Sequence, residues 1–166
     1  MSAEQASPGP RRVPQLREPV VLAAFEGWND AGEAASGALA HLAEVWDASP
    51  VVALDPEPYH DFQVNRPVVS FGEDGRRRIT WPTTRISWCR PPGSERDVVL
   101  VRGIEPSMRW MSYTDEVLGH VHDLGGTMLV TLGALLADVP HTRPIPVSST
   151  TDDADLLRRL ALEPSR

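Results

Sequence analysis

Three turns of this sequence carry polar side chains that could bind a ligand. Each comes after an apolar run of strand length, and together they offer carboxylates, a histidine, arginines and an indole: Glu26, Trp28, Asp30, Glu105, Arg109, His141 and Arg143. Arginine can bind a carboxylate or a phosphate through two parallel N–H donors. These residues therefore predict either a site for a small anionic or planar ligand or a polar surface that contacts another protein.

Several of these residues also suit purely structural roles. Asp30 is a good helix N-cap, and Glu33 lies three residues later, which is the spacing of a capping box. Glu105 precedes a proline and could simply shape its turn, and Arg143 could pair with Asp138. The polar residues thus remain open to both interpretations.

The sequence lacks the usual signatures of catalysis and of cofactor binding. It contains no Gly-x-Gly-x-x-Gly run, no Gly-x-Ser-x-Gly elbow and no Gly-Lys-Ser/Thr segment. All 16 basic residues are arginine, which excludes a lysine Schiff base. His120 and His122 are two apart on an expected helix, so they point to different faces and cannot easily share a metal ion. We therefore predict no catalytic residues, no metal ligands and no cofactor.

Composition excludes several classes of partner. The 166 residues carry a net charge of -7, which argues against a broad basic surface for nucleic acid. No apolar run approaches the ~20 residues that cross a bilayer, and residues 1–18 lack the apolar core of a signal peptide. The single cysteine, Cys89, fits a reducing cytoplasm. We expect a cytoplasmic protein without membrane or nucleic-acid partners, whose residues 1–18 form a disordered tail.

The elements that would position the three turns alternate between strands and helices. Apolar and β-branched runs predict strands at 20–25, 51–54, 85–90, 98–102, 127–132 and 147–150. One helix should follow Asp30, and one or two helical turns are expected within 134–139. A second helix should place one apolar face inward, made of Trp110, Tyr113, Val117, Val121 and Leu124. A last helix should begin at residue 151 or 152 and run towards Leu162.

This alternation is typical of an α/β domain, with a mixed, largely parallel sheet in a three-layer α/β/α arrangement. The runs 67–71 and 76–81 flank the turn sequence GEDG, which predicts a hairpin that adds antiparallel strands to the sheet. Because the carboxyl ends of parallel strands meet at one edge, we expect the three polar turns to lie together at that edge.

Three segments together resemble the proteasome assembly chaperone 2 family, in particular its bacterial, actinobacterial-type members. They are FEGWNDAGEAA (25–35), DFQVNRPVVSF with RRRITWPT (61–83), and GIEPSMRWMSYTDEVL with LGALLADVPHTRP (103–144). The resemblance runs in order from about residue 18 to residue 164. It implies a three-layer fold similar to purine nucleoside phosphorylases, of the phosphorylase/hydrolase-like type.

The resemblance also implies a function. Eukaryotic members of this family are chaperones for the α-ring of the proteasome core, which implies protein partners, including proteasome-related ones, and homo-oligomers of the full-length proteins. Family members continue past the point that matches Arg166. We therefore expect residues 19–166 to form a single α/β domain that is incomplete at its C-terminus and exposes apolar surface.

Two functions follow from these observations. The first is a non-catalytic, chaperone-like protein that works through a protein surface, which the absence of an assembled nucleophile and base favours. The second is an enzyme on a nucleoside-phosphorylase-like fold that binds a small anionic ligand at the carboxyl edge of the strands. Clustering of the polar turns around a concave pocket would favour the enzyme, and a flat rim would favour the interface.

Overall fold

The computed structural model describes residues 15–72 and 74–161. It divides into two compact units, residues 1–135 and residues 136–166. The sheets and the two longer helices belong to the first unit.

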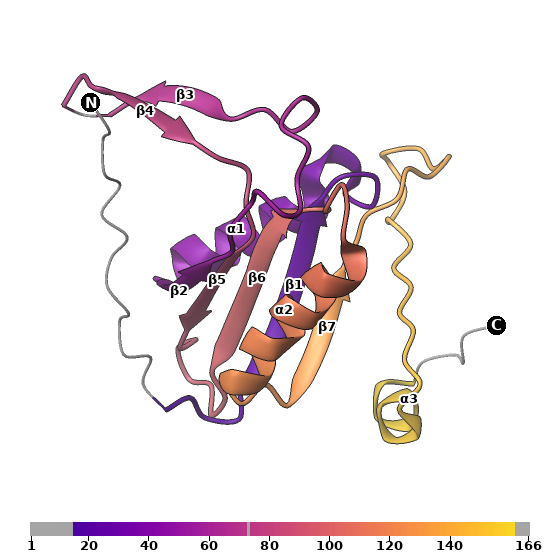
Figure 1. The fold of residues 1–166 in the computed structure, drawn as a ribbon. Coiled ribbons are helices and arrows are strands. Elements are labelled where there is room, and N and C mark those ends of the chain that lie inside the picture. Colours follow the sequence, from indigo (N-terminus) through magenta and orange to yellow (C-terminus); the bar gives the residue numbers. More distant parts are fainter. Residues whose placement is uncertain (1–14, 73, 162–166) are drawn as a thin grey trace. The chain divides into compact units, whose positions relative to one another are not determined.

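A five-stranded mixed sheet forms the centre of the first unit, in the order β2-β5-β6-β1-β7 (Figure 1). The strands are β1 (Val20–Glu26), β2 (Ser49–Ala53), β5 (Arg85–Cys89), β6 (Val98–Ile104) and β7 (Met128–Leu132). β1 pairs in parallel with both β6 and β7. β5 runs antiparallel to its neighbours β2 and β6. The predicted α/β class and the mixed, largely parallel sheet are therefore confirmed.

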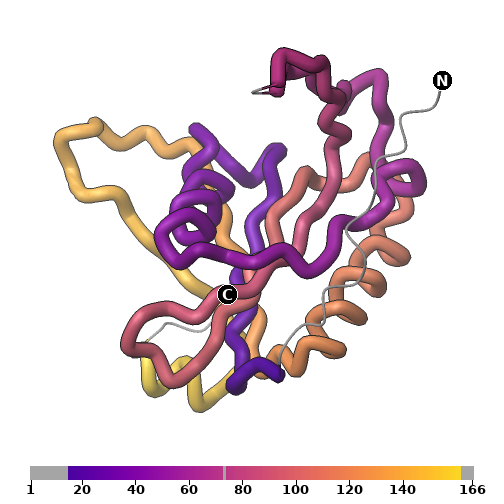
Figure 2. The backbone as a smooth tube through the Cα atoms, turned by 90° about the vertical axis from the view of Figure 1, so that its left-hand side faces the viewer, coloured from indigo at the N-terminus to yellow at the C-terminus, as the bar shows by residue number. Residues whose placement is uncertain are grey.

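Two helices cover opposite faces of this sheet. α1 (Ala34–Val45) packs with Leu39 on one face, against Leu100 of β6. α2 (Trp110–Asp123) packs on the other face, where Val101 of β6 belongs to the same core as Val117. Figure 2 shows the two helices on either side of the strands. Because successive residues of β6 are buried on alternate faces, the sequence of this strand is an almost continuous apolar run. With one helix on each face of the sheet, the three-layer arrangement is confirmed.

The predicted hairpin forms, but it does not join the main sheet. β3 (Val68–Phe71) and β4 (Arg77–Thr80) pair only with each other, in a separate two-stranded sheet. Pro67 and Pro82 flank the two strands. Because proline has no backbone N–H donor, neither flank can extend the ladder towards the central sheet. The expectation that the hairpin supplies the antiparallel strands was wrong, and β5 has that role instead.

The apolar face predicted for α2 is correct except at its first residue. Tyr113, Val117 and Val121 are buried and Leu124 packs beside them, whereas Trp110 is 54% exposed. The Tyr113 ring already packs edge-on against Phe25, close to the carboxyl end of β1. The preceding turn of α2 therefore lies beyond the end of the sheet, where it has no apolar surface to cover.

The second unit contains less regular structure than the sequence predicts. Residues 147–150 form no strand, and residues 134–139 form no helical turn. The last helix, α3 (Ala154–Leu160), begins after Asp153, whose side chain accepts hydrogen bonds from the N–H groups of Asp155 and Leu156. A cap of this kind suffices to define a short helix start. Leu162, the predicted end of the helix, lies outside the described residues.

A buried carboxylate joins three strands at the amino end of the sheet. Asp97, immediately before β6, is fully buried and accepts hydrogen bonds from the guanidinium groups of Arg17 and Arg90. The Arg90 guanidinium holds the pKa of this carboxyl well below its usual range, against the effect of burial, and Arg17 contributes in the same direction. Arg17 falls within the predicted disordered tail, of which residues 1–14 lie outside the described residues.

Replacing Asp97 with Asn should lower the free energy of unfolding by about 3 kcal/mol at neutral pH, because one buried charge and its paired hydrogen bonds are lost. The folded-state pKa of Asp97 is depressed, so its stabilisation is present above the unfolded-state pKa of about 4 and is lost as the pH falls below it. Urea denaturation at several pH values tests both statements. The difference between the two proteins should shrink in acid, and the exposed Asp115→Asn variant should behave like the original chain.

Candidate functional site

The first two polar turns meet at the carboxyl edge of the sheet. β1 and β6 are in parallel register, so that Glu26 lies opposite Ile104. The N–H of Glu105 donates to the carbonyl of Glu26 at 2.9 Å, and the N–H of Trp28 donates weakly to Glu105 Oε2 at 3.4 Å. Gly27 has φ +148°, and a Cβ there would lie 2.7 Å from Glu105 Oε2. The Glu105 carboxylate therefore lies directly over Gly27. Both the positive φ and the lack of space for a Cβ require glycine at this position.

Asp30 holds the start of α1. It is buried, and its Oδ1 accepts hydrogen bonds from the N–H groups of Ala35 at 2.8 Å and Ser36 at 3.2 Å. Burial alone would raise the pKa of Asp30, but the hydrogen bonds from Ser36 and Ala35 hold the pKa below its usual range. Its second oxygen, Oδ2, has no hydrogen-bond partner among the residues that the structure describes.

The capping box predicted for this helix is not formed. A short 3-10 helix, η1 (Ala31–Glu33), separates Asp30 from α1, and Glu33 itself has φ +55° and makes no capping hydrogen bond through its side chain. Asp30 thus reaches the first turn of α1 across the three residues of η1. The expected capping function of Asp30 is correct, and the role expected of Glu33 is wrong.

The end of β7 also meets the first polar turn. Ala134 accepts a hydrogen bond from the N–H of Ala31 and donates one to the carbonyl of Asn29, both at 2.9 Å. His141 and Arg143, the remaining predicted site residues, belong to the second unit, whereas Glu26 and Asp30 belong to the first. That they join Glu26 and Asp30 stays a prediction.

Arg109 and Trp28 are exposed near this edge. Arg109 has φ +56° and immediately precedes α2. The turn before it is held by the carbonyl of Tyr59, which accepts hydrogen bonds from the N–H groups of Ser107 at 2.8 Å and Met108 at 3.3 Å. Trp28 is 84% exposed. Neither side chain has a hydrogen-bond partner within the described part of the chain, so both are available to a ligand or to a protein surface.

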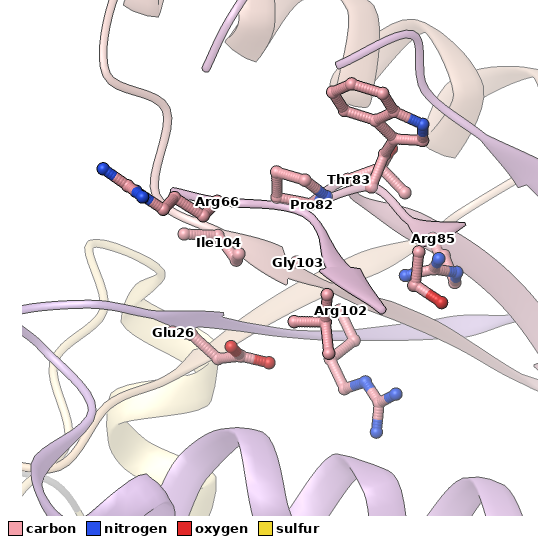
Figure 3. A pocket seen from close by; sticks show the side chains of 11 residues that line it. Glu26, Arg66, Pro82, Thr83, Arg85, Arg102, Gly103 and Ile104 are labelled. Carbon is pink, nitrogen blue, oxygen red and sulfur yellow. The ribbon is translucent and has the colours of Figure 1, made fainter. Parts of the chain in front are cut away.

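The hollow at this edge is lined largely by residues that the sequence analysis did not select. A cavity of about 180 Å³ lies between the carboxyl edge of the sheet and the base of the hairpin (Figure 3). Of the predicted site residues, Glu26 alone lines it. The charged lining consists of Glu26, Arg66, Arg85 and Arg102, and the rest of Val68, Thr80, Trp81, Pro82, Thr83, Gly103 and Ile104.

Two of these arginines face each other across neighbouring strands. Arg85, the first residue of β5, is the register partner of Arg102 on β6. Directly opposed residues on an antiparallel pair project from the same face, so both side chains line the cavity from the same face of the sheet. Neither has an ion-pair or side-chain hydrogen-bond partner among residues 15–72 and 74–161. This pair could not be found from the sequence, because Arg102 interrupts an apolar run and the order of β5 beside β6 is not encoded locally.

The described residues do not form an assembled nucleophile and base. Cys89 is buried, and burial, together with the nearby Asp97, raises the pKa of its thiol to about 11. His60 is buried as well, and burial lowers its pKa, so it is neutral at physiological pH. Within the part of the chain that is described, no three histidine, cysteine or acidic side chains gather as a metal site. The same part has no helix with the length and apolar character that crossing a membrane requires.

Comparison with known proteins identifies the family. The sequence profile of the PAC2 family matches residues 24–166. The chain belongs to the PAC2 family. Among curated proteins, none matches this PAC2 chain.

Solved structures of PAC2 proteins have the same fold. The chain is similar to a PAC2 family protein from Streptomyces avermitilis, with 58% identity, a TM-score of 0.84, and coverage of 89% of this chain and 63% of that one. It is also similar to a proteasome-assembly chaperone homologue from Mycobacterium tuberculosis, with 55% identity, a TM-score of 0.77, and coverage of 89% and 62%. A protein of unknown function from the same species is 29% identical, with a TM-score of 0.77 and coverage of 92% and 54%. The PAC2 chain therefore spans less than two thirds of the length of each of these relatives.

Replacing Asp30 with Ala should lower the free energy of unfolding by about 1–2 kcal/mol, because the N–H groups of Ala35 and Ser36 lose their acceptor. Asp30→Asn keeps an oxygen in that position and should lose less. Glu33→Gln is the matched control and should change stability by less than about 0.5 kcal/mol. Chemical denaturation measures the free energy of unfolding of all three variants. If Glu33→Gln loses as much stability as Asp30→Ala, Glu33 caps the helix as the capping box predicts.

Proposed function

We propose that this PAC2 chain is a chaperone-like protein that acts without catalysis, by binding a subunit of the proteasome core particle in the cytoplasm. The observation that carries the proposal is the exposed apolar face of the β3–β4 hairpin. The name of the Mycobacterium tuberculosis relative, a proteasome-assembly chaperone homologue, supports the choice of partner. Homo-oligomerisation, which the resemblance implies for the full-length family, stays a prediction.

The hairpin register places its apolar side chains together. Val69 is opposite Ile79, and Phe71 follows two residues after Val69, so the three project from one face. Arg77, opposite Phe71, shares this face, and its guanidinium lies over the Phe71 ring. Phe71 is 70% exposed and Val69 58% exposed. Trp81 continues this face beyond the end of β4, where its ring packs edge-on against Phe62 with a centroid distance of 4.9 Å. Exposed apolar side chains gathered on one face, with a charged residue beside them, favour protein–protein contact.

The other face of the hairpin is different in character. Ser70 is opposite Arg78, and Val68 is opposite Thr80. Val68 and Thr80 belong to the lining of the arginine cavity. Trp81 lines the cavity as well, so the apolar face and the cavity meet at this residue. Val69, Phe71 and Ile79 lie outside the lining, so they can be changed without altering it.

Replacing Phe71 and Ile79 together with Ser should weaken binding to isolated proteasome α-subunits at least about tenfold, because two apolar anchors are removed from the contact. Biolayer interferometry measures the affinity, and native gels measure the formation of core particles from mixed α- and β-subunits. Both side chains are exposed, so thermal unfolding of the variant should stay close to that of the original chain.

The matched control changes the opposite face, with Ser70→Asn and Arg78→Gln in one variant. It should bind the α-subunits normally. If the control weakens binding as much as the apolar variant, the contact does not use the apolar face. If the original chain binds neither subunit and does not alter assembly, the proposed function is wrong.

A further inference from the structure

The arginine cavity carries an excess of positive charge in a negatively charged protein. The whole chain has a net charge of -7, yet three arginines and one glutamate line this hollow. Its lining arises from two directions, since Arg85 and Arg102 come from the sheet and Arg66 from the segment that enters the hairpin (Figure 3). Positive charge that is concentrated in a concave region attracts and retains an anion.

The opposed pair of Arg85 and Arg102 favours binding of an anion in the cavity. Arg85 and Arg102 are directly opposite each other on neighbouring strands. Two like charges in such positions destabilise a sheet, whereas two opposite charges stabilise it. Glu26, the acidic residue of the lining, forms no ion pair with either arginine among the described residues. An anion with two charged oxygens could bridge the two guanidinium groups through paired N–H donors, and would turn a repulsion into two attractions.

The size of the cavity limits the ligand. A volume of about 180 Å³ is smaller than the roughly 300–1,000 Å³ of sites for drug-sized molecules. A phosphate group with a short carbon chain fits, whereas a dinucleotide does not. Glu26 can accept a hydrogen bond from a ligand hydroxyl group beside the arginines. We propose that the cavity binds a small phosphate monoester that carries a free hydroxyl group, with Arg85 and Arg102 on the phosphate and Glu26 on the hydroxyl.

Phe71 and Ile79, the residues varied in the test of the proposed chaperone function, lie outside the lining of this site, so the two tests are independent. The probes are sn-glycerol 3-phosphate, inorganic phosphate, malonate and glycerol, titrated calorimetrically into the full 166-residue chain in a buffer free of phosphate. We expect sn-glycerol 3-phosphate to bind more tightly than inorganic phosphate and malonate, and glycerol to give no measurable heat. Malonate binding as tight as sn-glycerol 3-phosphate would overturn the assignment to a phosphate ester.

Single variants identify the residues. Arg85→Gln and Arg102→Gln should each weaken binding of sn-glycerol 3-phosphate about tenfold to a hundredfold, as expected for loss of a charged hydrogen-bond donor. Arg76→Gln, an exposed arginine at the hairpin turn outside the cavity, is the matched control and should bind normally. Glu26→Gln should bind inorganic phosphate at least as well, but lose much of the preference for the ester. Equal weakening in all the arginine variants would show general charge attraction and overturn the site.

The ligand-free protein supplies a second measurement. If Arg85 and Arg102 repel each other in the empty cavity, replacing either one should leave the Tm unchanged or raise it. Added sn-glycerol 3-phosphate should raise the Tm of the original chain and of Arg76→Gln, but not that of Arg102→Gln. A lower Tm in both ligand-free arginine variants would assign these side chains a structural role and overturn the proposal.

Discussion

One buried carboxylate at the amino edge of the sheet fixes how β1 and β5 meet β6. Asp97 accepts hydrogen bonds from the guanidinium groups of Arg17 and Arg90, its N–H donates to the carbonyl of Arg17, and its carbonyl accepts from the N–H of Val20. These contacts tie the segment before β1 and the end of β5 to the start of β6. Because β1 and β6 have equal lengths and pair without a shift, alignment at Val20 and Val98 also aligns Glu26 with Ile104 at the far edge. The ion cluster at the amino edge therefore determines that Glu26 and Ile104 are opposite each other at the carboxyl edge.

The far edge has two parts with different characters. Between β1, β6 and β7, the turns are closed by hydrogen bonds, with Glu105 over Gly27 and Ala134 beside Asn29. Between β5, β6 and the hairpin base, the side chains leave a charged hollow. The antiparallel direction of β5 causes this difference, because it brings the start of a strand, Arg85, to an edge otherwise formed by strand ends. The same reversal lets the hairpin, which precedes β5, rise from the rim of the hollow.

Local patterns in the sequence predict the strands β1, β6 and β7 and the helix α2 with its buried Tyr113 and Val117. They also predict that an oxygen of Asp30 caps the following helix. Each of these depends on residues close together in the chain. Three features depended on which strands pair and in which direction, and were missed: the antiparallel position of β5 between β2 and β6, the independence of the hairpin, and the opposed arginines. Trp110 has the spacing of a buried residue, but spacing cannot tell where the sheet beneath a helix ends. Several motifs that carry the family resemblance, including those around Gly27 and Ala134, lie where the turns of the edge touch.

Burial of the single thiol has a practical consequence for experiments. Cys89 is enclosed between the sheet and α1, and a pKa of about 11 leaves only about one molecule in ten thousand as thiolate at neutral pH. Maleimide reagents and mild oxidants attack the thiolate, so the native side chain should be silent towards both. A new thiol introduced at an exposed hairpin position would react alone, without removal of Cys89 from the core. The molecule is in effect prepared for single-site spin or fluorescence labelling.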